Sequence, residues 1–138
     1  MAARVILAMV VVFVVWSALD FAIHGVLLGP TYRETADLWR PMEEMKMGWM
    51  YGATAVGAVC FTAIYLLIRP KSAAKGVAYG LLFGIGTGVP MGLATYSTMP
   101  IPSRLAVGWA LGSMVEAVIA GLLVALIVGS CRILGVFV

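Results

Sequence analysis

The stretch GVAYGLLFGIGTGVPMGLATY, residues 76–96, combines an apolar run with a glycine at every fourth position. In lipid the hydrophobic effect does not draw helices together, so close backbone approach and dispersion contacts must do so. Five glycines in register remove the side-chain ridge that would hold a neighbouring helix away, and they are far more specific than one GxxxG pair. The stretch therefore predicts a transmembrane helix with a glycine-zipper face, formed by Gly76, Gly80, Gly84, Gly88 and Gly92.

The composition of the whole chain agrees with a membrane protein. Of its 138 residues, 63% are hydrophobic and only 11% are charged, with a mean hydropathy of +1.08. A soluble domain carries roughly 25% charged residues. The net charge of +3 comes from basic residues spread along the chain without a cluster, which excludes a nucleic-acid partner. The expected surroundings are the lipid bilayer.

Four apolar stretches each approach or exceed the length of about 20 residues that crosses a bilayer. We place them at roughly 5–28, 47–68, 76–98 and 105–128, joined by a loop over 29–46 and two short turns. The first run is too long for the apolar core of a secretory signal, so it is expected to remain as a span. The sequence predicts one all-α transmembrane domain over residues 1–138, a bundle of four helices.

The distribution of basic residues predicts the orientation of the bundle. Arg69, Lys71 and Lys75 lie in the turn after the second span with no acidic residue beside them. Arg4 and Arg132 fall on the same side. Because basic loops stay in the cytoplasm, both termini are expected inside, and the loop over 29–46 is expected outside.

The last span carries a second track of small residues. Gly108, Gly112, Glu116 and Ala120 follow one another at intervals of four. We expect the spans at 76–98 and 105–128 to pair through their tracks, with a kink at Pro90. A glycine face also suits self-association, so a homo-oligomer or a larger membrane complex is expected.

The stretch SALDFAIHGVLL, residues 17–28, places ionisable side chains inside an apolar span. Asp20 and His24 lie one helical turn apart and can meet on one face. A charged group at the bilayer centre costs at least about 2.5–3.5 kcal/mol, so such groups usually turn inward and pair. Glu116, in the last span, is the third ionisable group of this kind.

Depth along the helices brings further polar groups into the same layer. Counting about 1.5 Å per residue from the loop end of each span places Asp20, Glu116, Thr54 and Thr87 in one half of the bilayer. Trp16 precedes Asp20 by one turn and is expected to pack beside it. The sequence thus predicts an intramembrane polar layer to which all four helices contribute.

Three interpretations of this layer remain open. It could be a structural clasp, a proton relay or cation site built from Asp20, His24 and Glu116, or the acid and base of an intramembrane enzyme. Carboxylate and imidazole ligands also suit a divalent metal ion, although the spacing of these three residues matches no metal motif. No HExxH or GxSxG motif is present, so we assign no catalytic residue and do not predict an enzyme.

No cofactor is required by the sequence. Four methionines lie close together and could suggest copper, but their spacing does not place them on one helix face; they are Met42, Met45, Met47 and Met50. A haem with two histidine ligands would need a second histidine, and the chain has one. The cysteines, Cys60 and Cys131, are too far apart for a paired motif and are expected to be buried thiols.

Three strings, LDFAIHGVLLGP (19–30), LWRPMEEMKMGW (38–49) and TYSTMPIPSRLAVGW (95–109), resemble those of an uncharacterised family of small bacterial membrane proteins with four transmembrane helices. The resemblance covers most of the chain and implies a multi-pass protein of the bacterial inner membrane. It implies no activity and no functional residues.

The sequence favours a small membrane protein that binds or translocates a proton or small cation in an oligomer. The alternative is a non-catalytic accessory subunit of a larger membrane complex, respiratory or redox in kind. Three ionisable groups exceed what a structural clasp requires, which is why we favour the first.

Overall fold

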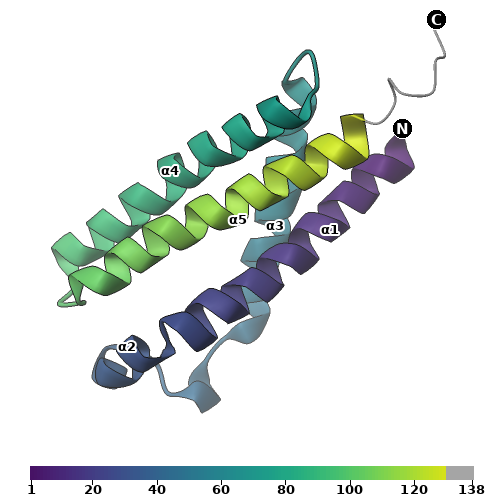
Figure 1. Cartoon of the computed structure of the whole chain (residues 1–138). Helices are drawn as coiled ribbons and strands as arrows, with labels where there is room; N and C mark the ends of the chain where they lie inside the picture. The colour runs from purple at the N-terminus through teal and green to yellow at the C-terminus, as the bar shows by residue number, and fades with distance from the viewer. Residues whose placement is uncertain (130–138) are drawn as a thin grey trace, which may run out of the picture.

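The computed structural model describes residues 1–129, which form helices and short connections without a strand in that part of the chain (Figure 1). Four helices are long and apolar enough to cross a membrane: Ala2–Leu27, Met47–Leu67, Ala73–Thr98 and Ser103–Gly129. These ranges confirm the predicted all-helical class and the four predicted spans. Cys131 and Arg132 lie outside the described residues.

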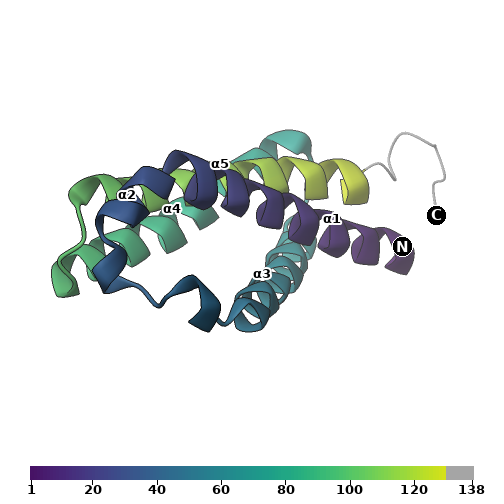
Figure 2. The same ribbon diagram turned by 90° about the horizontal axis from the view of Figure 1, so that it is seen from below.

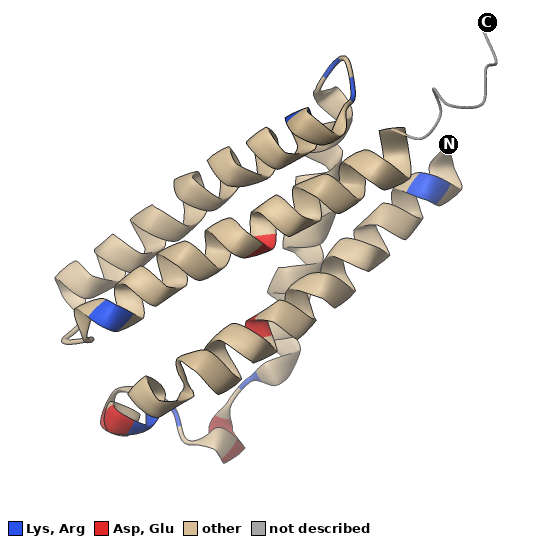
Figure 3. Cartoon of the chain, in the orientation of Figure 1, with Lys and Arg blue, Asp and Glu red and all other residues tan. Residues whose placement is uncertain are grey.

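The helices form an antiparallel arrangement with α5 at its centre. α4 (Ala73–Thr98) and α5 (Ser103–Gly129) run side by side along their lengths, and α1 (Ala2–Asp20) lies on the other flank of α5 (Figures 1 and 2). α3 (Met47–Leu67) crosses beneath them at a steep angle. Charged residues lie mainly near the helix ends and in the connections (Figure 3).

The glycine face of α4 lies directly against the backbone of α5. A Cβ added at Gly80 would clash with the carbonyl oxygen of Ala117, and one added at Gly76 would clash with that of Gly121. All five glycines of the track are buried. α5 therefore occupies the space that side chains on this face would need.

The second track, on α5, does not pair with α4 as expected. A Cβ at Gly108 would lie 2.7 Å from Leu28 Cδ2, and one at Gly112 would lie 3.1 Å from Ile23 Cγ2. α5 packs between two helices and is built from small residues on both sides. The face carrying Gly108, Gly112 and Glu116 consequently faces the first span.

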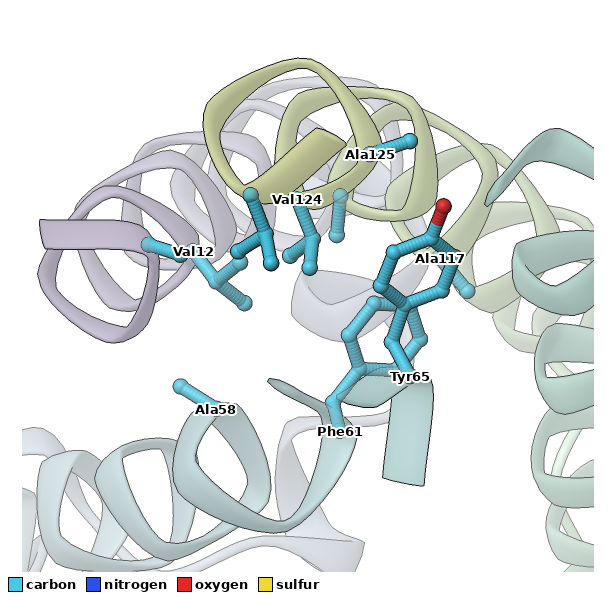
Figure 4. Close-up of a cluster of buried hydrophobic side chains, with 10 residues drawn as sticks. Val12, Ala58, Phe61, Tyr65, Ala117, Val124 and Ala125 are labelled. Atoms are coloured by element: carbon cyan, nitrogen blue, oxygen red, sulfur yellow. The ribbon is translucent and has the colours of Figure 1, made fainter. Parts of the chain in front are cut away.

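α3 packs through only one of its halves. Its buried residues are Ala58, Phe61, Thr62 and Tyr65. The side chains of Ala58, Phe61 and Tyr65 join residues of α1 and α5 in the main core (Figure 4). At the other end of the helix, Cβ atoms added at Gly48 and Gly52 would have no atom of the described part of the chain within 4 Å. The first half of α3 thus stands away from the other three spans.

The loop over 29–46 contains more helix than predicted. It comprises α2 (Gly29–Glu34) and two single 3-10 turns, η2 (Ala36–Leu38) and η3 (Met42–Glu44). Met45 is extended and separates η3 from α3, which begins at Met47, where the second span was predicted to begin.

Pro90 lies inside α4 without dividing it, since the helix runs from Ala73 to Thr98.

Beside the connection between α4 and α5, Glu34 on α2 forms an ion pair with Arg104 at the start of α5. Around this pair, a second apolar cluster of Ile101, Leu105, Ala106 and Trp109 packs against residues of the loop. We call this region, where the loop meets the turn between α4 and α5, the loop end of the bundle.

Candidate functional site: a polar cavity between the four spans

A cavity of about 380 Å³ lies between the four spans, beside the half of α3 that stands away. Its lining includes every side chain of the expected polar layer except His24. Thr54 comes from α3 and Thr87 from α4, while α5 adds Ser113, which the sequence reasoning did not single out. The polar lining residues are Asp20, Thr54, Thr87, Ser113 and Glu116, and the apolar ones are Trp16, Ala53, Gly57, Phe83, Met91 and Ala117.

Glu116 lines this cavity, and one of its carboxyl oxygens has no hydrogen-bond partner among the described residues. This atom, Oε1, is buried. The carboxyl group also lies close enough to that of Asp20 for the two to interact electrostatically. Two like charges facing one cavity of low dielectric repel each other, so a proton or another cation between them stabilises the pair.

Trp16 holds the wall next to these acids in place. Its indole Nε1 donates a hydrogen bond of 3.0 Å to the backbone carbonyl of Glu116. Its ring meets that of Phe61 edge to face, with centroids 5.2 Å apart. The packing role expected for Trp16 beside the polar pair agrees with these contacts, which also fix α1 against α5 at the level of Asp20.

The threonines of the cavity can only accept hydrogen bonds from a ligand. Thr54 Oγ1 donates to the carbonyl of Met50 at 3.1 Å, and Thr87 Oγ1 donates to that of Phe83 at 2.8 Å. Each hydroxyl proton is thereby used within its own helix, which leaves lone pairs for the cavity. Because no lysine or arginine among residues 1–129 lines the cavity, its polar surface is rich in acceptors and carries negative charge.

The helix of the first span changes type at Asp20. Phe21–Leu27 form a π-helix, η1, and the N–H of Leu28 donates to the carbonyl of Ile23 at 2.8 Å, five residues back. π segments are rare and often occur at functional sites. Within η1, His24 Nε2 lies 3.9 Å from Asp20 Oδ1, so the two side chains meet as their spacing predicts. Nothing in the sequence indicated the π segment.

A hydrogen-bonded chain continues from His24 toward the loop end. His24 Nδ1 lies 2.7 Å from the hydroxyl of Tyr32, and Trp109 Nε1 donates to the same hydroxyl at 2.7 Å. Since an indole N–H only donates, the arrangement that satisfies every group has Tyr32 donating its proton to Nδ1. Neutral His24 then carries its own proton on Nε2, the nitrogen that faces Asp20.

Burial at the loop end raises the pKa of the Tyr32 phenol, and Asp20 adds to this effect, while the bond from Trp109 opposes it. The phenol therefore stays protonated at neutral pH and remains a donor. Its ring also contacts Trp39 at 5.4 Å between centroids. Sequence reasoning missed Tyr32 and Trp109 because aromatic residues near span ends usually serve as interfacial anchors.

The metal interpretations find little support in the geometry. Within residues 1–129, no three His, Cys, Asp or Glu side chains gather closely enough to hold a metal ion. His24 points its Nδ1 at Tyr32 and is not among the residues lining the cavity.

Cys60 is exposed, contrary to the buried thiol expected, because it lies on the outer side of α3.

Comparisons of the chain with protein-family models, curated proteins and solved structures gave no match.

Proposed function

We propose that this protein binds protons at Asp20 and Glu116 and relays them between the polar cavity and the loop end through His24 and Tyr32. The observation that carries the proposal is the sequence of contacts from the Glu116 carboxyl to Asp20, then to His24 at 3.9 Å and to Tyr32 at 2.7 Å. Every member of this sequence can hold or hand over a proton.

The histidine is suited to the middle of such a relay. Tyr32 can pass its hydroxyl proton to Nδ1 while it takes a replacement proton from solvent at the loop end. The Nε2 proton can then leave toward Asp20, and rotation or reverse transfer resets the ring. The 3.9 Å gap between Nε2 and Asp20 is longer than a hydrogen bond, so a small movement or a bridging water completes the step. The π segment is the part of α1 that would absorb this movement.

The proton is favoured over a divalent cation by the ligand set. A divalent ion would need three or more protein ligands at one point, and the described residues do not provide such a group. A proton needs only the paired carboxyl groups. We place the protein in the bacterial inner membrane with both termini inside, so that Tyr32 and the loop end face outward.

We further propose that the protein works as a homo-oligomer. Within an apolar span, 38% of the His24 side chain remains accessible in the single chain, and His24 is not among the residues that line the cavity. Polar surface of this kind is costly in contact with lipid. A second copy covering the first span would shield it and leave the cavity intact.

Proton flux into liposomes tests the proposal. Purified protein is reconstituted with a trapped pH-sensitive dye, and acidification is followed after a pH gradient is imposed. We expect Asp20→Asn and Glu116→Gln to slow the flux by about a hundredfold, as for loss of a proton-transfer group. Glu43→Gln is the matched control, because it removes an acid from the loop outside the cavity.

The proposal is wrong if both variants conduct protons like the wild type. Variants that conduct normally but unfold at lower temperature would instead identify the layer as a structural clasp. A wild-type protein that is inert alone, yet co-purifies with a larger cofactor-bearing complex, would favour the accessory-subunit alternative.

A further inference from the structure

We infer that the polar cavity also binds an organic monocation with an apolar body, such as an aromatic quaternary ammonium, in exchange for a proton. This inference rests on the proposed function and names a second ligand for the same carboxyl groups. A proton alone needs no cavity, whereas about 380 Å³ lies within the range of small-molecule sites.

The polar lining selects a positive charge. Asp20 and Glu116 provide the negative charge, and Thr54 and Thr87 add lone pairs without donor protons. Because no basic side chain of the described residues lines the cavity, an anion would meet repulsion from the two carboxyl groups there. The carboxyl groups of Asp20 and Glu116, both on the lining, are the groups expected to approach the cationic centre.

The apolar lining selects an aromatic or aliphatic body. The rings of Trp16 and Phe83 and the thioether of Met91 border the same space. Phe61 contacts both rings edge to face, at 5.2 Å from Trp16 and 4.9 Å from Phe83, so these walls are held in place before a ligand arrives. Aromatic faces beside carboxylates are the usual combination for quaternary ammonium recognition.

The helices leave a lateral route into the cavity. At one end α3 and α4 are joined by ring contacts and by the hydrogen bond of 2.8 Å from Tyr79 to the carbonyl of Phe61. Toward the loop end α3 stands away, and Ala53, Thr87 and Met91 of the lining are exposed. An amphiphilic cation dissolved in the outer part of the bilayer could therefore enter between α3 and α4.

Charge balance links the two ligands. When the cation enters, its charge replaces that of a proton shared by the carboxyl groups, and this proton leaves through His24 and Tyr32 once the imidazole has adopted the tautomer with Nε2 free to accept it. Only O–H and N–H bonds are broken and formed. The exchange keeps the net charge of the cavity unchanged, so the two carboxylates are never left without a compensating positive charge.

Calorimetry in lipid nanodiscs tests the inference with benzyltrimethylammonium as the probe. We expect wild type to bind it, Glu116→Gln to weaken binding by about tenfold or more, and Glu43→Gln to leave it unchanged. Neopentylbenzene, the neutral molecule of the same shape, should bind more weakly by a similar factor. Asp20→Asn serves as a second variant, and its elution as a single folded species is checked first.

Proton release on binding is measured from the dependence of the heat on the ionisation enthalpy of the buffer. Release of a proton with each cation supports the inference. Equal binding of the neutral molecule, or binding unaffected by both carboxyl variants, would overturn it as partition into an apolar space. Absence of probe binding with normal proton flux in liposomes would overturn it while leaving the proposed function intact. Binding that depends on Glu116 without proton flux would refute the proposed function and the exchange together.

Discussion

At the scale of single residues, Tyr32 connects the loop end to the intramembrane acids. One hydroxyl accepts from Trp109 and donates to His24, so its loss affects two partners at once. The sequence could indicate Asp20 and Glu116, because ionisable groups in apolar spans are rare. It could not indicate Tyr32, since the contact with His24 depends on α2 folding back over the end of the first span.

Tyr32→Phe tests this connection. The change leaves the Trp109 N–H and His24 Nδ1 without their shared partner, and we expect a loss of about 1 kcal/mol in the free energy of unfolding, since the site is only partly buried. Proton flux should fall as well. The measurements are thermal unfolding in detergent and the liposome assay. Tyr96→Phe, at a residue that is 50% exposed, is the matched control, and equal results for both variants would contradict the role of Tyr32.

At the scale of the elements, the structure separates two kinds of glycine on the same chain. The track of α4 faces the backbone of α5, whereas Gly108 and Gly112 face side chains of η1 and of the residue after it. The sequence predicted which faces carry these glycines. It did not predict which helix each face contacts, because both sides of α5 are built from small residues. The π segment was equally unreadable, since apolar residues within a span suit either kind of helix.

Two alanine substitutions on α4 test the close approach of α4 and α5. Gly80→Ala places a methyl group against the carbonyl oxygen of Ala117, and we expect overpacking to cost about 1–3 kcal/mol. Gly86→Ala has nothing within 4 Å and should be neutral or stabilising by up to about 1 kcal/mol. Unfolding in mixed detergent micelles measures both, and a Gly80→Ala protein as stable as Gly86→Ala would refute the packing.

At the scale of the whole molecule, the four spans were readable from sequence because each is a long apolar run. The sequence did not predict that the first half of α3 stands away from the other helices, since lipid-facing and helix-facing residues of a span are equally apolar. That departure opens the cavity, and the cavity brings Asp20 of the first span and Glu116 of the last together within one chain. The protein can therefore form its site without contributions from a second copy, whatever its oligomeric state.

Co-reconstitution of the two carboxyl variants tests this central claim most directly. Liposomes receive Asp20→Asn alone, Glu116→Gln alone, or both proteins mixed before reconstitution, and proton flux is compared with that of the wild type. If each chain holds the complete site, the mixture should remain as inactive as either variant, because no chain carries both carboxyl groups. Recovery of flux in the mixture would show that the site forms between two copies, and would contradict the account.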